Sequence, residues 1–366
     1  MKNHGNNIFV TKGAPESIIE LSTHVIWKDK KRALNSALLK EIKSILIASN
    51  HLVQTGGTET YTYAIIKELL VRGFEVEYFT FIKGDFSSRM EKELGVKFQS
   101  KKRYDLILAN HNTCVEALMG FGFIIQTCHG IYPPLEQPSL CANFHVAISQ
   151  EVQNHLAIRG FVSVVIMNGI DTSKFYSKKN VNKELKNVLS LCQSEEANKF
   201  LQGVCDTLGL NFVYLNKNIN PIWNVEDLIN NADLVIGLGR SVYEAMACGR
   251  PAIVYDNRAY FESFSDGYIA KKLFTSLSCN CSGRFYKLKL TEEMMIDEFK
   301  KFNSTDGEIL KNLIMDDMTI QLVVDKYLNL NDSLQYNLNG FKKNYFLKFT
   351  QKLFYVRIIK MFLKRN

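Results

Sequence analysis

Apolar and polar residues alternate with two different periods along most of the chain. Residues 44–49 (SILIAS) form a short apolar run, residues 60–73 (TYTYAIIKELLVRG) carry apolar side chains at helical spacing, and residues 74–81 (FEVEYFTF) alternate as a strand does. The pattern predicts further strands at 104–110, 123–130, 144–149 and 162–169, and further helices at 114–122 and 150–160. Short apolar strands separated by helices predict a parallel sheet with helices on both faces.

A second unit with the same pattern begins after a polar, lysine-rich segment at 172–186, which is typical of a linker. Its predicted strands are at 187–192, 211–216, 233–239 and 251–256, and its predicted helices are at 194–209, 225–232 and 241–249. We therefore expect an α/β protein with two doubly wound, Rossmann-like domains that face each other across a cleft. The expected divisions are an N-terminal extension (1–42), the first domain (43–171), the linker, the second domain (187–285), a helical region (286–340) and a basic, aromatic tail (341–366).

The composition is that of a globular protein with one unusual end. Of the 366 residues 46% are hydrophobic, which is enough for two domains with separate cores. The net charge of +8 comes entirely from residues 341–366, which contain eight Lys and Arg and no Asp or Glu, while the rest of the chain holds 37 basic and 37 acidic residues. This balance gives no reason to expect nucleic acid as a partner. As a helix, the tail would place aromatic and basic side chains on an anionic membrane surface, and packing on the protein is an equally open alternative.

The cysteines and the apolar runs bear on the compartment. Eight cysteines are scattered through apolar segments without a pair of Cys-x-x-Cys motifs, which argues against a zinc ribbon. No signal peptide is predicted, and no apolar run reaches the about 18–20 residues of a membrane span. We expect a cytoplasmic protein with reduced thiols, and the tail adds a peripheral position at the inner face of the plasma membrane as an option.

Candidate binding residues follow the predicted strands, where ligands bind in doubly wound sheets. In the first unit these residues are Gly56, Gly57, His129, Asn168 and Gly169. In the second unit, residues 237–256 read GLGRSVYEAMACGRPAIVYD. The backbone N–H groups at 239–242 begin a predicted helix and are suited to hold a diphosphate, to which Arg240 would add a charge-assisted contact.

Five segments, in their order along the chain, resemble glycosyltransferases of the two-domain GT-B type, close to family 4. The segments are GGTETYTYAIIKELLVRGFEVEYFT, IIQTCHG, FHVAISQEVQNHL, VIMNGIDTSKF and ADLVIGLGRSVYEAMACGRPAIVYD, within about 43–256. Each segment alone is a weak signal, but five in register make the resemblance specific. Residues 266–285, with DGYI and CNCSGRF, resemble a subset of these enzymes that pairs Gly-Arg-Ser/Thr-x-x-Glu-Ala with a downstream Ser-Gly-Arg.

The resemblance implies a retaining enzyme with a nucleotide-sugar donor, here a UDP- or GDP-sugar. It assigns Glu244 to the ribose hydroxyls and His129 to the donor sugar, and it makes His129 and Arg240 the catalytic candidates. The implied donor-binding residues are Gly56, Gly57, Gly239, Arg240, Ser241, Glu244 and Arg284, and those of the acceptor side or hinge are Thr58, Glu59, Asn168 and Gly169. For each of them the alternative is a purely structural role, such as a surface ion pair or a tight turn. No metal is expected, because the chain has no Asp-x-Asp triplet and helix ends and arginines can neutralise phosphate.

Two positions depart from the pattern of the family. Its members usually carry two glutamates eight positions apart, and the upstream position here is Ile236. They also usually carry a basic pair after the strand at 187–192, and none is present. The candidates to supply the missing charge are Arg240, Arg250 and Arg284. Since the subset itself lacks the upstream glutamate, we expect a variant site rather than a lost one.

Residues 8–42 weakly resemble a fragment of the nucleotide-binding domain of P-type ATPases, through the stretch Lys12-Gly13-Ala14-Pro15-Glu16. In that family the lysine lines an ATP pocket. The phosphorylated Asp-Lys-Thr-Gly motif is absent, which excludes ion pumping. We expect a fusion remnant or a misplaced start here rather than an ATP site.

The function hypothesis is transfer of a hexose from a nucleoside diphosphate to a glycan or lipid-linked acceptor. Catalysis would come from electrostatic stabilisation of the leaving diphosphate and from domain closure that excludes water. Three alternatives remain open. The chain could be an inactive GT-B protein that binds a glycan or a partner, a nucleotide-sugar epimerase of the same fold, or a membrane scaffold that acts through its tail.

Overall fold

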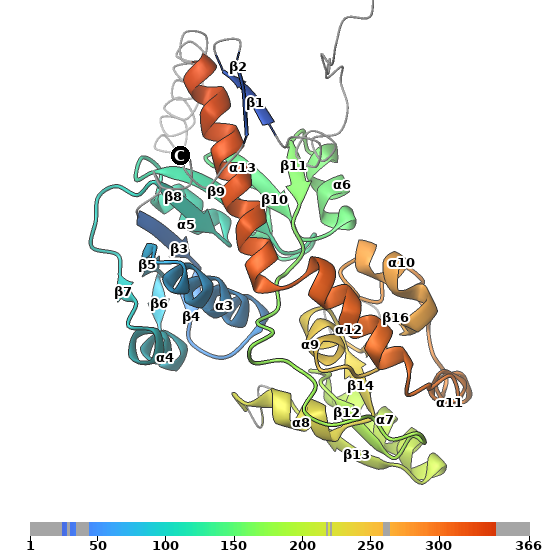
Figure 1. Ribbon diagram of the computed structural model, residues 1–366. Coiled ribbons are helices and arrows are strands. Elements are labelled where there is room, and N and C mark those ends of the chain that lie inside the picture. The colour runs from blue at the N-terminus through green and yellow to red at the C-terminus, as the bar shows by residue number, and fades with distance from the viewer. Residues whose placement is uncertain are drawn as a thin grey trace, which may run out of the picture.

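The computed structural model describes residues 24–27, 30–33, 44–216, 219, 222–258 and 264–341, which fold into two α/β domains (Figure 1). The first domain contains a seven-stranded parallel sheet with the strand order β11-β10-β9-β8-β3-β5-β7. Its strands are β3 (Ser44–Ala48), β5 (Glu75–Phe79), β7 (Lys97–Phe98), β8 (Leu106–Ala109), β9 (Phe123–Cys128), β10 (Phe144–Ala147) and β11 (Ser163–Val165). The parallel sheet confirms the predicted fold class for this half.

Helices cover both faces of this sheet because its strands are apolar on both sides. Ile45 and Ile47 pack on the side of α3 and α13, whereas Leu46 and Ala48 pack on the side of α5. The helices next to this sheet are α3 (Gly57–Val71), α4 (Asp85–Leu94), α5 (Asn112–Ala117), α6 (Gln150–Ile158) and the 3₁₀ turn η1 (Pro134–Glu136). Two short pairs lie outside it, β4 (His51–Leu52) with β6 (Ile82–Lys83) and β1 (His24–Trp27) with β2 (Lys30–Ala33).

The second domain contains a five-stranded sheet with the order β13-β12-β14-β15-β16. Its strands are β12 (Asn187–Ser190), β13 (Asn211–Tyr214), β14 (Leu234–Gly237), β15 (Ala252–Asp256) and β16 (Phe264–Tyr268), and only β16 is antiparallel. Its helices are α7 (Glu195–Leu208), α8 (Val225–Asn231), α9 (Arg240–Ala247), the 3₁₀ turn η2 (Ala270–Lys272), α10 (Leu273–Ser278), α11 (Glu292–Phe299) and α12 (Asp306–Asp317). The predicted strands and helices of this unit therefore form as expected, and β16 is an addition.

The helical region expected over 286–340 is divided between the two domains. Helices α11 and α12 pack on the second domain, whereas α13 (Ile320–Phe341) returns to the first domain and packs against α3 (Figure 1). The chain crosses between the domains twice at the same place. There the N–H of Ile170 donates to the carbonyl oxygen of Met318, and the carbonyl oxygen of Ile170 accepts from the N–H of Ile320. The buried side chains that α13 adds to the core of the first domain are Val323, Val324, Tyr327, Leu328 and Leu330.

Gly169 lies at this crossing, where Ile320 and Val323 of α13 leave little room for a side chain. A Cβ at this position would lie 3.1 Å from the Cα of Ile320 and 3.1 Å from the Cβ of Val323. Glycine therefore permits the close approach of the first domain's last segment to the returning helix. The two crossings between the domains therefore lie side by side.

Two interpretations of the sequence fall largely outside the described residues. Within the segment that resembles a P-type ATPase fragment, residues 8–42, the structure describes only the strands β1 and β2. The tail that we expect on a membrane surface lies beyond residue 341 and is not described. In the described part of the chain, no helix combines the length and the apolarity needed to span a bilayer.

Candidate active site

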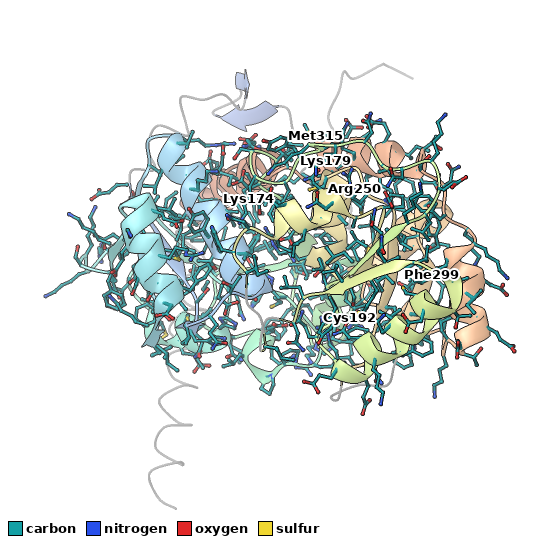
Figure 2. The ribbon with its side chains drawn as sticks, turned by 90° about the horizontal axis from the view of Figure 1, so that it is seen from below. Lys174, Lys179, Cys192, Arg250, Phe299 and Met315 are labelled. Carbon is teal, nitrogen blue, oxygen red and sulfur yellow. The ribbon has the colours of Figure 1, made fainter. Side chains whose placement is uncertain are left out.

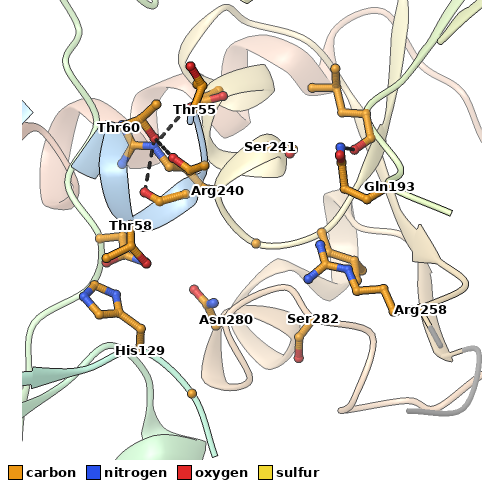
Figure 3. Close-up of a pocket in the computed structure, with 18 of the residues that line it drawn as sticks. Thr55, Thr58, Thr60, His129, Gln193, Arg240, Ser241, Arg258, Asn280 and Ser282 are labelled. Atoms are coloured by element: carbon orange, nitrogen blue, oxygen red, sulfur yellow. Dashed lines mark hydrogen bonds and ion pairs between the residues drawn. The ribbon is translucent and has the colours of Figure 1, made fainter. Parts of the chain in front are cut away.

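A cavity of about 880 Å³ lies between the two domains at the carboxyl ends of their strands. The first domain contributes Gly56, Gly57, Thr58, His129 and Asn168 to its lining, and the second contributes Gly239, Arg240, Ser241, Glu244 and Arg284. Figure 3 shows Thr58 and His129 on one side of this space and Ser241 on the other. The structure thus brings together ten of the predicted site residues, and it leaves Glu59 and Gly169 outside the lining.

Two helices begin at this cavity, one from each domain. Gly56 is the N-cap of α3 and Gly239 is the N-cap of α9, so neither cap has a side chain that could occupy the first backbone N–H groups. Gly239 has φ +57°, which favours glycine, whereas Gly56 is extended and a Cβ on Gly57 would meet nothing within 4 Å. Neither Gly56 nor Gly57 has a positive φ, and the space next to Gly57 is open. Both helix ends direct partial positive charge into the same cavity.

Glu244 lies one turn into α9 and forms a buried ion pair with Arg240. The Arg240 Nε and the Glu244 Oε1 are 2.9 Å apart, and the two side chains are 9% and 10% exposed. Arg240 also donates from Nη1 to the carbonyl oxygen of Gly169 at 2.9 Å, so it ties the second domain to the last segment of the first domain. Burial raises the pKa of the Glu244 carboxyl above its usual range, and the charge of Arg240 opposes this rise.

His129 is held as a neutral imidazole against the first domain. Its Nε2 lies 3.0 Å from the Oδ1 of Asn110, and Asn110 Nδ2 donates to Ser49 and Thr62. Because the amide nitrogen is used by those two hydroxyls, Nε2 carries the proton and Nδ1 is left as an acceptor. Burial lowers the pKa of His129 to about 3. At neutral pH the ring can accept a hydrogen bond from a hydroxyl, but it does not carry a positive charge.

Three further predicted residues have surroundings that their sequence context did not indicate. Arg284 pairs across the domain interface with Glu151 of α6, at 2.7 Å from Nε to Oε1. Glu59 is buried and lies 3.3 Å from the Nε2 of His51, away from the cavity lining. Asn168 is buried in the cavity wall, and its Oδ1 has no hydrogen-bond partner among the described residues.

The position eight residues before Glu244 does not face the cavity. Ile236 lies in the middle of β14, is fully buried, and packs in the cluster under α7 and α11, on the opposite face of the sheet from α9. Only Leu238 and Gly239 connect β14 to α9. A glutamate at position 236 would therefore be buried in the core and could not hold a sugar, so the departure reflects a short connection rather than the loss of one contact.

The basic pair that the resemblance leads us to expect after β12 is replaced here by a different arrangement of side chains. Gln193 follows β12 at the cavity, and Arg258, beyond the end of β15, also lines it (Figure 3). Buried Asp256 joins the two, because it accepts from the backbone N–H of Gln193 and from the Nε of Arg258. Arg250, by contrast, is 1% exposed inside the second domain and donates to backbone carbonyls there (Figure 2). It is therefore not available to a ligand in the cavity, whereas Arg258 is a cavity-lining cation that was not among the predicted residues.

Lys174 is a second missed residue, because it lies in the segment interpreted as a linker. Its Nζ donates to the carbonyl oxygen of Trp223 at 2.7 Å, lies 3.6 Å from Glu226, and sits over the Trp223 ring. The ring of Trp223 packs in turn against Tyr63 of the first domain, with 5.1 Å between their centroids. Burial lowers the pKa of Lys174. A polar linker composition cannot show that one of its lysines is folded into a cavity wall.

Glu136 of η1 is a third missed residue and leads to a prediction about pH. Its carboxyl lines the cavity next to Gly130 without a hydrogen bond or ion pair to another described residue, and burial raises its pKa to about 7. Between the ordinary glutamate pKa of about 4.3 and this value, the folded state holds a proton that the unfolded chain has lost. The contribution of Glu136 to the free energy of unfolding should therefore fall as the pH rises through this interval.

In the variant Glu136→Gln the side chain cannot ionise, so this decrease in the free energy of unfolding with rising pH should be absent. We therefore expect the melting temperature of Glu136→Gln, relative to that of the wild type, to increase between about pH 5 and pH 8. The measurement is differential scanning calorimetry at constant ionic strength. Other titrating groups act equally in both proteins, so the difference isolates Glu136. A difference in melting temperature that does not change with pH would show that Glu136 has an ordinary pKa.

The described residues contain no cluster of three or more His, Cys, Asp and Glu side chains that could hold a metal ion. Transfer without a metal stays a prediction.

Comparison with known proteins supports the fold. No protein-family model and no curated protein matches the sequence. Among solved structures, the chain resembles Anabaena HepE in complex with UDP and glucose, with a TM-score of 0.54, 14% identity, and coverage of 80% of this chain and 100% of HepE. AviGT4, a glycosyltransferase involved in avilamycin A biosynthesis (TM-score 0.48, 11% identity, 81% of this chain and 98% of that chain), and Staphylococcus aureus MnaA with UDP (0.48, 13%, 81% and 97%) are more distant. Together with its own two-sheet topology, the likeness to HepE shows that this chain has the GT-B fold.

Proposed function

We propose that the protein is a glycosyltransferase that moves a hexose from a UDP- or GDP-sugar to a hydroxyl of a glycan or lipid-linked acceptor, with retention. The observation that carries this proposal is the meeting of two glycine-capped helix ends at one interdomain cavity, with buried Glu244 one turn beyond the second of them. The backbone N–H groups at two helix N-termini can bind the negatively charged diphosphate of such a donor. A buried carboxylate can accept hydrogen bonds from the two neighbouring hydroxyls of its ribose. The family resemblance and the solved structures with UDP agree with this reading.

Each part of the donor has a place in this arrangement. Glu244 would accept the ribose hydroxyls, the N–H groups at the start of α9 would hold the diphosphate, and the sugar would lie between α9 and His129. The neutral His129 would accept a hydrogen bond from a sugar hydroxyl. The helix ends and Arg258 would stabilise the charge that develops on the leaving diphosphate, which is where such enzymes gain most of their rate.

We propose that contacts between the domains keep the site closed during transfer. Arg284 pairs with Glu151, Arg240 donates to the hinge carbonyl of Gly169, and Trp223 packs against the first domain. Closed walls exclude water from the donor, which favours transfer over hydrolysis.

A donor panel tests the proposal. We expect isothermal titration to show binding of UDP or GDP, and we expect slow release of the nucleoside diphosphate from one UDP- or GDP-hexose even without an acceptor. Failure of the full-length protein to bind any of these nucleotides would contradict the proposal and favour a protein that keeps the fold only to bind a glycan or a partner. A new nucleotide-sugar formed without an acceptor would favour an epimerase instead.

The acceptor and the membrane surface are further parts of the same proposal. A lipid-linked acceptor fits a cytoplasmic enzyme whose residues 341–366 carry eight basic and no acidic side chains. Sedimentation with vesicles of phosphatidylserine and phosphatidylcholine tests this part by itself. A chain that remains in the supernatant at low salt would contradict a peripheral membrane position.

A further inference from the structure

The loop between α10 and the Ser-Gly-Arg stretch closes one side of the cavity at the start of α9. Asn280 and Ser282 of this loop line the cavity, and Asn280 lies close to Gly239, because its Nδ2 is 3.4 Å from the position that a Cβ on Gly239 would occupy. The loop is joined to the N-cap itself, since the N–H of Gly239 donates to the carbonyl oxygen of Cys281 at 2.9 Å. The side chain of Asn280 therefore stands beside the helix end that would hold the diphosphate.

The orientation of the Asn280 amide is set by Tyr243, which belongs to α9. The hydroxyl of Tyr243 donates to Asn280 Oδ1 at 2.8 Å. With the oxygen used in this way, Nδ2 is the end of the amide that remains for the cavity, and no described residue accepts a hydrogen bond from it. Figure 3 shows the amide turned toward the open space, with His129 on one side and Ser282 on the other.

The backbone of this loop is held in a conformation that few residues adopt. Asn280 has φ +57° and Cys281 has φ +45°. Asparagine tolerates this region better than most residues, and each such residue outside glycine carries a conformational cost that its surroundings must offset. The hydrogen bonds from Tyr243 and Gly239 fix the loop in place, so the amide is positioned before any ligand arrives.

We propose that Asn280 donates through Nδ2 to the distal phosphate of a nucleoside diphosphate, the phosphate that carries the sugar. This inference rests on the proposed function. The first two N–H groups of α9 have no acceptor within the helix, and the Asn280 amide and the Ser241 hydroxyl line the cavity next to them. Glu244 lies one turn further along α9 on the ribose side, whereas Asn280 lies toward His129, which places its donor at the sugar end of the diphosphate.

The proposal also explains how a site without an upstream glutamate can hold its donor. β14 runs almost directly into α9, so the connection is too short to carry a carboxylate to the sugar end. The loop at 279–284 occupies that side of the cavity instead and offers an amide. An amide N–H can donate a hydrogen bond to an anionic phosphate oxygen, whereas a carboxylate can only accept one, for example from a hydroxyl.

The test compares nucleotides that differ by one phosphate, using the full chain. Asn280→Gly removes the amide and keeps the positive φ, and Asn280→Asp keeps the shape but places a carboxylate against the phosphate. By isothermal titration we expect Asn280→Gly to lose about tenfold in affinity for UDP and to bind UMP as the wild type does, with a larger loss for UDP in Asn280→Asp. The pair GDP and GMP is run in parallel.

Lys287→Gly is the matched control, because Lys287 also has a positive φ but is exposed outside the cavity lining, and both affinities should stay unchanged. Equal losses for UDP and UMP in Asn280→Gly, or no loss for either, would overturn the assignment to the distal phosphate. A loss seen only with a UDP-sugar and not with UDP would also overturn it, because the amide would then contact the sugar. A wild-type protein that binds none of the four nucleotides would overturn the proposed function as well as this inference, whereas normal UDP binding with an unaffected variant would overturn this inference alone.

Discussion

Glu244→Gln is expected to weaken binding of the nucleoside diphosphate by about tenfold to a hundredfold, as judged by isothermal titration. The carboxylate lies in the cavity wall at 10% exposure, so a charged acceptor for the ribose hydroxyls is replaced by a neutral amide of nearly the same shape. A hydrogen bond to a charged group contributes about 1.5–3 kcal/mol, which corresponds to this range. Glu244→Ala should lose at least as much affinity.

The same variant also disturbs the protein itself, because Arg240 loses its partner. Breaking a buried ion pair on one side costs about 3–5 kcal/mol when the other charge stays buried, so the melting temperature of Glu244→Ala should fall. A measurement of affinity alone would therefore confuse a lost contact with a damaged fold.

Glu68 provides a matched control for this effect. It forms an ion pair with Arg72 over the same spacing of four residues, with 2.7 Å between Arg72 Nε and Glu68 Oε1 and a carboxylate side chain that is 9% exposed, and it does not line the cavity. Glu68→Gln should also lower the melting temperature, although by less because Arg72 keeps Asp325 as a partner, and it should leave nucleotide affinity unchanged. If Glu244→Gln binds the nucleotide as tightly as the wild type, Glu244 has no place in the donor site.

The second large effect is expected far from the cavity in sequence, at Tyr327 of α13. Its ring is 2% exposed in the core of the first domain, and its hydroxyl bonds to Tyr61 at 3.1 Å and to Thr127 at 2.7 Å. Truncation of a buried aromatic side chain to alanine costs about 3–5 kcal/mol, and here two hydroxyl partners are left in the core as well. We expect Tyr327→Ala to lower the free energy of unfolding by at least that amount in urea titration.

The effect should reach the active site through one intermediate ring. Tyr61 packs edge-on against His129 with 5.3 Å between ring centroids, so a disturbed Tyr61 would release His129. We therefore expect reduced donor turnover in Tyr327→Ala even at temperatures where the variant remains folded. Asn329→Ala on the exposed side of the same helix is the control and should change neither property. Unchanged stability in Tyr327→Ala would contradict the packing of α13 on the first domain.

Several features of the fold were predictable from local pattern. The strand over 44–49, the helix that follows Gly57 and the alternation in the second unit all appear as predicted, because burial on both faces requires continuous apolar strands and helices reveal their period. The same reasoning places Gly57, His129, Gly239 and Glu244 in one cavity, since parallel strands end at the same edge of a sheet.

Other features depend on contacts between segments that are distant in sequence. The helical pattern of residues 320–341 does not state which domain the helix joins, and α13 in fact completes the core of the first one. The roles of arginines were equally hidden, because Arg250 is enclosed by backbone carbonyls and Arg284 meets Glu151 from the other domain. The identity of a charged residue does not show whether it lies in a core, at a domain interface or at a phosphate site.

The sequence by itself therefore determined the two α/β units, the edge at which their strands end, and the helix start that carries Gly239 and Glu244. Only the tertiary structure decided that position 236 faces the core, that Asn280 and Arg258 reach the cavity, and that α13 closes the first domain. The physical reason is that periodicity and glycine preferences are local properties of the chain, whereas the partners of a polar side chain are chosen by packing.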